Sequence, residues 1–158
     1  NNQGMSILRM YLLGMLSLML CLTSCGEYYY IENDLHGLWQ VTSVERLSTG
    51  EVAESQGQLY YSFQRTMVML SDVDLEIPGK LKRYIAHFDF LASDSISMGD
   101  FRNRTTGEGD FLLQETKIPL ELLCKFGLYQ DCTTFHMEQS KQRLILTSDS
   151  ACVVLRKY

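Results

Sequence analysis

The chain has 158 residues, a formal net charge of −5 and 46% hydrophobic residues. This length fits one domain of ordinary size preceded by a short leader. The acidic balance argues against a nucleic-acid partner, whose phosphates would be repelled, so we expect no nucleic-acid binding.

The first 25 residues contain an apolar segment that ends in a cysteine. Met5 is the expected initiator, which makes residues 1–4 additional to the natural start, and Arg9 supplies a positive charge before the apolar run of residues 10–22. This run is shorter than the roughly 20 residues that a membrane-spanning helix needs. It therefore predicts a signal peptide rather than a retained membrane helix.

The leader ends in Leu22-Thr23-Ser24-Cys25, a Leu, two small residues and a Cys. This order resembles the lipobox of bacterial lipoproteins. The resemblance implies cleavage before Cys25 and acylation of its thiol, with a signal peptide over residues 1–24, the lipidated Cys and its tether over 25–34, and one domain over 35–158. The lipid bilayer would then be a partner of the protein. The residue after Cys25 is Gly26, whereas an Asp at this position would resemble an inner-membrane retention signal. The resemblance therefore favours the outer membrane of the cell envelope.

Most of the remaining chain has the alternating pattern of β-strands. Strands are expected at residues 37–44, 82–91, 95–98 and 111–114, and a closing meander at 133–139, 143–148 and 151–157. Residues 58–71 are expected to form one long bent strand, since no Gly, Asn or Pro marks a turn, although a hairpin at 64–66 would add a strand. Polar loops are expected at 47–57 and 99–109. Pro119 and Gly127 bound one short helix, near 119–126, whose apolar residues recur at a spacing of three.

The first expected strand begins with Gly37-Leu38-Trp39, which resembles the opening Gly-x-Trp of lipocalin-like barrels. The resemblance implies a mainly β fold, an antiparallel up-and-down lipocalin-like barrel of about eight strands, with Gly37 and Trp39 closing one end. The helix departs from the family pattern because it precedes the last three strands.

A barrel of eight strands is just wide enough either to be filled by side chains or to hold one small ligand. Both alternatives are open at this point. The first hypothesis is a small apolar ligand in the envelope; the second is a scaffold or inhibitor with a filled barrel, which contacts another envelope protein through loops 47–57 and 99–109. The residues expected to line the interior are Tyr61, Phe63, Met67, Met69, Tyr84, Phe88, Phe90, Phe135 and Met137.

The sequence contains no pattern typical of catalysis. The three His residues are far apart, and the nucleophile elbow, the phosphate loop and the dinucleotide fingerprint do not occur. Asp72, Asp74 and Glu76 alternate but lack the spacing of a calcium loop, so they predict a solvated loop. We expect a protein without enzymatic activity, metal or cofactor.

Three cysteines follow the lipobox. A disulfide between Cys124 and Cys132 is expected across the turn that contains Gly127, because an exported domain meets oxidising conditions. Cys152 would remain a free thiol. The alternative is a domain with no disulfide.

Overall fold

The computed structural model divides the chain into two units, Asn1–Asn33 and Asp34–Tyr158. The structure describes residues 35–77, 79–104 and 113–158, all of them in the second unit. The predicted signal peptide, the lipobox with Cys25 and the tether lie outside the described residues. None of the described helices is long and apolar enough to cross a membrane.

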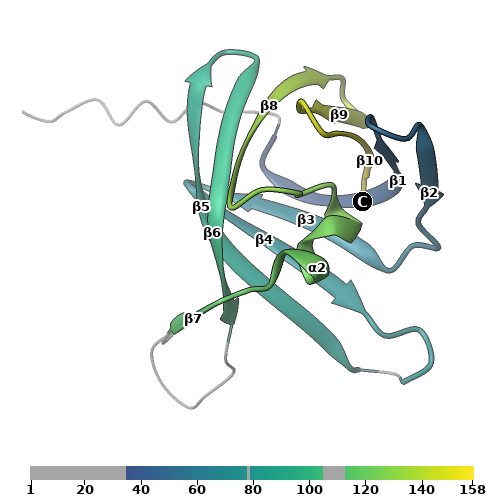
Figure 1. Ribbon diagram of the computed structural model, residues 1–158, viewed down its shortest axis with the longest axis vertical. Coiled ribbons are helices and arrows are strands. Elements are labelled where there is room, and N and C mark those ends of the chain that lie inside the picture. Colours follow the sequence, from purple (N-terminus) through teal and green to yellow (C-terminus); the bar gives the residue numbers. More distant parts are fainter. Residues whose placement is uncertain (1–34, 78, 105–112) are drawn as a thin grey trace, which may run out of the picture. The chain divides into compact units, whose positions relative to one another are not determined.

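Eight antiparallel strands of the second unit form a closed barrel (Figure 1). Each strand pairs with its neighbours in the order below, and β10 closes the barrel by pairing with β1. This confirms the predicted fold class. The strands are β1 (Gly37–Arg46), β3 (Leu59–Gln64), β4 (Met67–Val73), β5 (Leu81–Ala92), β6 (Ser95–Arg104), β8 (Cys132–Gln139), β9 (Arg143–Thr147) and β10 (Ala151–Lys157).

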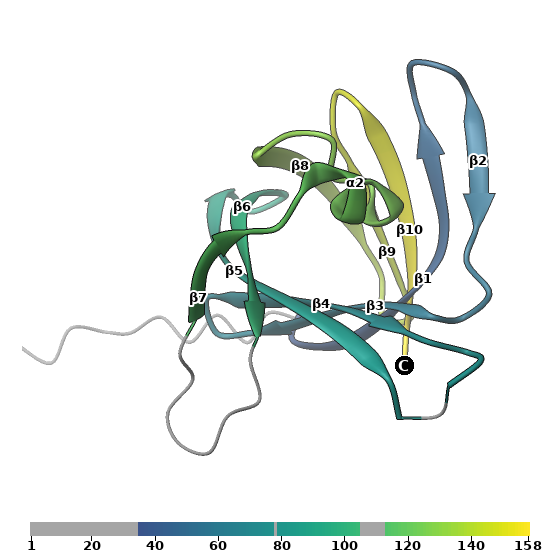
Figure 2. The ribbon, with the colours of Figure 1, turned by 60° about the horizontal axis from the view of Figure 1, so that its bottom comes forward.

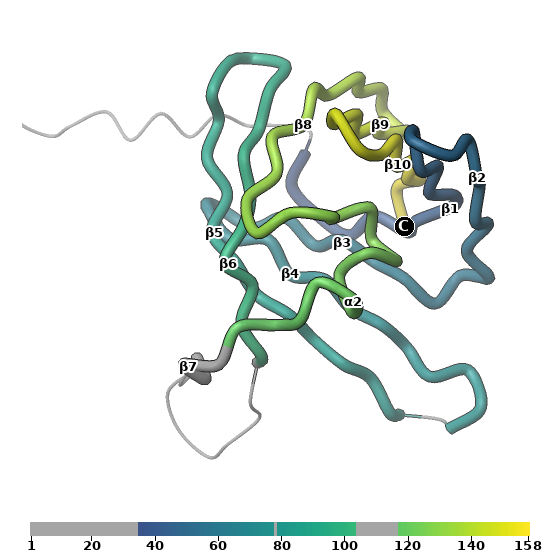
Figure 3. Tube along the Cα trace, in the orientation of Figure 1, coloured from purple at the N-terminus to yellow at the C-terminus, as the bar shows by residue number. Residues whose placement is uncertain are grey.

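Four further elements lie outside the barrel wall. β2 (Glu51–Glu54) pairs with the last four residues of β1, and β7 (Leu113–Lys117) pairs with the end of β6. α2 (Leu120–Leu123) continues directly into a 3-10 turn, η1 (Cys124–Phe126). In Figure 3 the trace after α2 passes in front of β3 and β4 and then enters β8. The predicted helix is therefore present, but only its first turn is α-helical.

Two of the predicted loops contain strands. Residues 51–54 form β2, and residues 99–104 belong to β6, whereas residues 105–112 lie outside the described part of the chain. All four side chains of β2 are exposed, so this strand has no alternation that sequence could reveal. Backbone pairing with β1, rather than side-chain burial, makes it a strand.

The chain turns back between β3 and β4, where one long strand was predicted. Gln64 pairs with Met67, and Arg65 occupies the turn with φ of 56°, a conformation that sequence does not flag for a residue other than Gly, Asn or Asp. The prediction of a single strand was wrong. The hairpin also reverses which side chains of β4 face inward.

Facing partners in a ladder lie on the same side of the sheet. Phe63 is inward and pairs with Val68, so Val68 and Leu70 are buried. Met67 and Met69 alternate with them and lie on the outer face, half-buried. The prediction that these two methionines line the interior was wrong, because a two-residue turn shifts the inward positions of β4 by one residue.

Trp39, which was expected to close one end of the barrel, is buried near the start of β1. Its ring is fully buried, and Nε1 donates a hydrogen bond of 2.7 Å to the carbonyl oxygen of Leu35. Lys157 Nζ lies 4.4 Å from the ring centroid and donates to the carbonyl of His36. Gly37 has φ of 119°, which permits the chain to enter the strand beside Lys157.

The described strands surround one contiguous apolar core. Strand β5 shows the predicted alternation, with Tyr84, Ala86 and Phe88 buried. The closing strands β9 and β10 also alternate, and their buried residues are Leu144, Leu146, Val153 and Leu155. Because the closed barrel and its core belong to the unit Asp34–Tyr158, this unit has what a domain needs to fold alone.

Candidate functional site

The predicted interior residues lie mainly in an aromatic cluster below η1. Tyr61 stacks on Phe63 with 5.9 Å between ring centroids, and Phe63 meets Phe88 edge-on at 5.3 Å. Phe126 enters from η1 and lies within 6.4 Å of Tyr84 and 6.0 Å of Tyr61. These rings pack against one another, so this part of the barrel contains side chains rather than a ligand.

The other predicted interior residues join the same core. Phe135 and Met137 are buried on β8, and Phe90 is half-buried where it packs against the core. Tyr61 also holds η1 in place, because its hydroxyl donates a buried hydrogen bond of 2.6 Å to the carbonyl oxygen of Phe126. η1 therefore acts as a plug that fills the barrel from one end.

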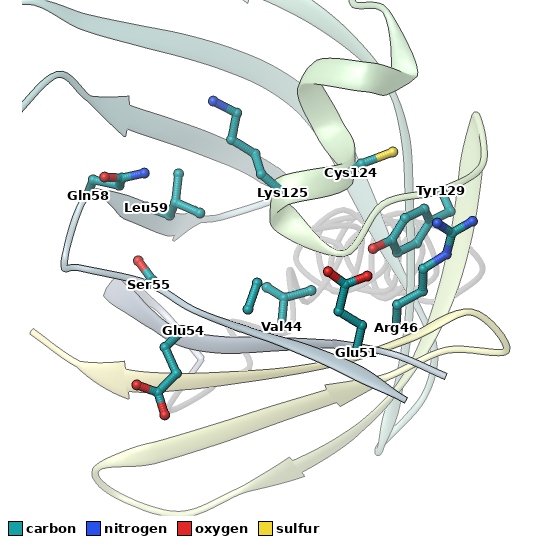
Figure 4. Close-up of a pocket in the computed structure, with 11 residues that line it drawn as sticks. Val44, Arg46, Glu51, Glu54, Ser55, Gln58, Leu59, Cys124, Lys125 and Tyr129 are labelled. Carbon is teal, nitrogen blue, oxygen red and sulfur yellow. The ribbon is translucent and has the colours of Figure 1, made fainter. Parts of the chain in front are cut away.

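A pocket of about 440 Å³ lies above this plug, between η1 and the β1–β2 hairpin. Figure 4 shows its lining side chains, which come from two stretches that are distant in sequence, 44–59 and 124–129. The lining residues are Val44, Arg46, Glu51, Ala53, Glu54, Ser55, Gln58, Leu59, Cys124, Lys125 and Tyr129. This mouth pocket is the candidate site.

The pocket exists because β1 changes partner along its length. Residues Gly37–Gln40 pair with β3, whereas residues Ser43–Arg46 pair with β2. The β1–β2 hairpin therefore extends away from β3 (Figure 2), and the space between them is bordered by η1. Gly127 ends η1 with φ of 81°, and a Cβ there would lie 2.4 Å from Val153. Only glycine permits this close approach of η1 to β10.

The floor of the mouth pocket is apolar and its rim is charged. Val44 and Leu59 are buried, whereas Arg46, Glu51 and Lys125 are exposed. The Arg46 guanidinium lies 5.1 Å from the centroid of the Tyr129 ring, within the range of a cation–π contact. Lys125 forms an ion pair with Asp72 at the end of β4. Both basic side chains of the pocket thus have an internal partner.

The acidic and hydroxyl groups of the pocket have fewer partners. Glu51 and Glu54 form no ion pair with any described residue. The Ser55 Oγ atom is buried without a hydrogen-bond partner in the described part of the chain. Burial raises the pKa of Tyr129, the nearby Cys124 and Glu51 raise it further, and Arg46 opposes them.

The described residues show no arrangement that would bind a metal ion. No group of three or more His, Cys, Asp or Glu side chains gathers in residues 35–77, 79–104 and 113–158. Asp74 instead accepts hydrogen bonds from the N–H groups of Glu76 and Ile77 and pairs with Lys80 at 3.3 Å. The hydrogen bond from Glu76 is the main reason that the pKa of Asp74 is lowered.

Cys124, Cys132 and Cys152 are free thiols. The predicted disulfide between Cys124 and Cys132 was wrong, because the two side chains lie in different parts of the structure. Cys124 lines the mouth pocket. Cys132, at the start of β8, pairs with Gly99 of β6, and its Sγ atom lies 3.3 Å from the hydroxyl oxygen of Ser97.

Sequence reasoning pointed to only part of this site. The predicted polar loop 47–57 does supply Glu51, Ala53, Glu54 and Ser55. Arg46, at the end of β1, was missed, and so were Cys124, Lys125 and Tyr129, which meet the hairpin only through the docking of η1. No local pattern marks them.

Comparisons with known proteins agree with the observed barrel. A family model described as a lipocalin-like domain matches residues 20–158. A lipocalin-like protein from Bacteroides uniformis ATCC 8492 is similar in structure, with a TM-score of 0.58 and 20% identity over 80% of this chain and 100% of that one. An uncharacterized protein from Bacteroides eggerthii DSM 20697 has a TM-score of 0.57 and 17% identity over 78% of this chain and 99% of that one. No curated protein matches this sequence.

Proposed function

This chain belongs to the lipocalin-like domain family, and we propose that it is a lipid-anchored envelope protein that holds a small, partly apolar ligand in the mouth pocket. The observation that carries the proposal is the pocket itself. Its volume of about 440 Å³ falls within the range of about 300–1,000 Å³ that is common for small-molecule sites. An apolar floor with a few polar groups at the rim is the usual lining of such sites.

The ligand position differs from the first expectation. Tyr61, Phe63 and Phe126 fill the space below η1, so the ligand would lie above the plug rather than deep in the barrel. No reaction is proposed. The pocket places no His beside a nucleophile, so the proposal is for a binding protein.

A fluorescent probe tests this binding. The neutral apolar dye N-phenyl-1-naphthylamine is titrated into the unit Asp34–Tyr158, and we expect saturable binding of one molecule. Ala53 lies on exposed β2 and lines the pocket, so Ala53→Trp should fill the pocket without disturbing the core and weaken binding at least about tenfold. Ala92→Trp, at an exposed position at the end of β5, is the matched control. Equal binding by both variants would refute the proposed site.

The membrane anchor is the second part of the proposal. The motif ending at Cys25 supports acylation, and the similar structures come from Bacteroides, in keeping with a bacterial lipoprotein. The outer membrane is the favoured location.

Replacement of the lipidated cysteine tests the anchor. The variant Cys25→Ser in the full chain should not incorporate labelled palmitate, and its signal peptide should remain uncleaved. The unmodified chain should incorporate the label and fractionate with outer membranes. Labelling that persists in Cys25→Ser would show that acylation occurs elsewhere.

The exposed β1–β2 hairpin favours a second candidate, a scaffold or inhibitor that contacts an envelope protein. Leu47 and Val52 are 42% and 55% exposed on this hairpin. Photocrosslinking from position 52 in intact cells should then capture one protein, and Leu47→Glu should abolish the crosslink. Ligand binding in the mouth pocket should survive Leu47→Glu, which separates the two functions.

A further inference from the structure

β2 is an edge strand with one open side. It stands at the end of the strand order, and β1 is its one neighbour among the described strands (Figure 1, Figure 2). The N–H of Ser55 donates to the carbonyl oxygen of Thr42, its partner in the continued β1–β2 register. Successive residues of an antiparallel strand direct their backbone groups to opposite sides. Ala53 therefore bonds toward β1, whereas Val52 and Glu54 direct their N–H and C=O groups to the open side.

The open edge is held in a fixed position. Residues Ser43–Arg46 of β1 pair with β2 on one side and with β10 on the other, so β2 is the outer strand of a three-stranded sheet. All four of its side chains are exposed. An exposed, ordered edge is a template on which another chain can pair.

The mouth pocket lies on the inner face of this same edge. Ala53 lines the pocket and faces Val44 across the ladder, whereas Val52 and Glu54 alternate with it on the outer face. In Figure 4 the Glu54 side chain extends away from the cavity. A strand that paired with Val52 and Glu54 would carry one side chain opposite Ala53, on the inner face. That side chain would be directed at the pocket floor, which Val44 and Leu59 make apolar.

We infer that the open edge of β2 accepts an extended segment of another protein as an added strand. The segment has an apolar side chain directed into the mouth pocket and a lysine or arginine on either side of it. Backbone hydrogen bonds would supply the affinity of such a complex, and the pocket its specificity. This inference rests on the second candidate function, contact with an envelope protein through the β1–β2 hairpin, and adds the mode of contact and the class of sequence.

The outer face of the hairpin favours a basic segment over a second copy of this chain. Glu45 and Glu54 are diagonal neighbours there, and neither forms an ion pair with a described residue. β2 begins with Glu51 and ends with Glu54, so the pairing of two β2 strands would bring the glutamates of both copies together. Like charges across a ladder are destabilising. A cationic side chain in the added strand would meet these carboxylates instead.

A synthetic peptide tests strand addition. The probe is a capped, fluorescein-labelled peptide with the sequence Gly-Thr-Val-Lys-Leu-Lys-Val-Thr-Gly, which alternates as a strand and reads the same in both directions. Its result therefore does not depend on whether it pairs parallel or antiparallel to β2. We expect saturable binding of one peptide to the unit Asp34–Tyr158, measured by fluorescence anisotropy.

Backbone methylation of the peptide separates edge pairing from side-chain contact. With the central Leu opposite Ala53, the N–H groups of the two Lys residues point toward β2 and that of the Leu points away. N-methylation of both Lys residues should weaken binding at least about fivefold, because the hydrogen bonds to β2 are lost. N-methylation of the central Leu is the matched control and should have a smaller effect.

Side-chain changes in the peptide test the class of sequence. Replacement of both Lys residues by Glu should weaken binding at least about fivefold, because like charges would then face each other across the ladder. Replacement of the central Leu by Asn should also weaken binding, because a polar amide would lie on the apolar floor.

Two substitutions test the same edge from the protein side. Val52→Pro removes an N–H that points away from β1, and proline is tolerated on edge strands at such positions. It should weaken the peptide at least about fivefold, whereas Val52→Thr, which keeps the N–H, should bind like the parent. Thermal unfolding checks that both variants are folded. The methylated peptides give the same test without any change in the protein.

The outcomes separate the inference from the proposed functions. Absence of saturable binding by the parent peptide, or equal binding of the Lys-methylated and Leu-methylated peptides, would overturn strand addition. Equal binding of the Glu-containing peptide would overturn the basic sequence class. Dye binding in the mouth pocket and the crosslink from position 52 are measured independently, so they show whether either proposed function fails as well.

Discussion

Replacing Tyr61 with Phe removes a hydroxyl that joins β3 to η1. The hydroxyl donates to the carbonyl oxygen of Phe126 over 2.6 Å, and both residues are fully buried. The phenyl ring retains its contacts with Phe63 and Phe126, so little packing is lost. The main cost is a buried carbonyl without a donor, which lowers the free energy of unfolding by about 1–3 kcal/mol.

Urea unfolding followed by Trp39 fluorescence measures this loss. The midpoint of Tyr61→Phe should fall while the slope m stays constant, because the surface exposed on unfolding is the same. Tyr158→Phe is the control, since Tyr158 is 75% exposed and lies at the end of the chain. If Tyr61→Phe were as stable as the parent, the hydrogen bond would not hold η1 in the barrel.

Alkaline pH tests the same group by titration. Burial raises the pKa of Tyr61 above its ordinary value of 10.0, so the neutral hydroxyl is favoured in the folded state. The resulting stability is fully present below about pH 10 and is lost as the pH rises further. Tyr61→Phe should show a shallower loss above pH 10. The stability of the variant should still fall with pH, because the pKa values of Tyr84 and Tyr129 are raised as well. Parallel curves for parent and variant would contradict the assignment to Tyr61.

Further substitutions test the packing and the thiols. Gly99→Ala should lower the free energy of unfolding by at least about 2 kcal/mol, because its Cβ would lie 2.3 Å from the carbonyl oxygen of Asp131. An unchanged midpoint of urea unfolding would disprove this close approach. Phe88→Ala should cost about 3–5 kcal/mol in the same measurement, since the buried ring packs against Phe63. Cys132 is exposed and should react with a thiol reagent faster than Cys124, as peptide mass spectrometry can show. Isolation of a Cys124–Cys132 peptide would contradict the free thiols.

The parts of the fold that were predictable are those in which side-chain burial and strand periodicity coincide. β5 alternates cleanly from Tyr84 to Phe88, and several such segments in succession supported the barrel class that the Gly37-x-Trp39 resemblance implied. The β3–β4 hairpin was missed because Arg65 adopts a positive φ without the usual turn residues. That single turn moved Met67 and Met69 to the outer face.

The site was less predictable because its parts are assembled by long-range contacts. β2 contributes to the pocket although none of its side chains is buried, so hydrophobic pattern could not identify it. Lys125 and Tyr129 enter the pocket only because Phe126 and Gly127 dock η1 against β3 and β10. The list of predicted interior residues described the core below the plug and missed the cavity above it.

Phe126 links the stability of this barrel to the shape of its pocket. Its ring packs in the aromatic cluster, and its carbonyl oxygen accepts the hydrogen bond from the Tyr61 hydroxyl that links η1 to β3. Cys124 and Lys125 of the same turn line the pocket. A substitution that loosens η1 would therefore enlarge the pocket and expose the core together. The same short turn closes the interior and forms one wall of the pocket, so a ligand that bound there would stabilise the fold by an amount set by its affinity and concentration.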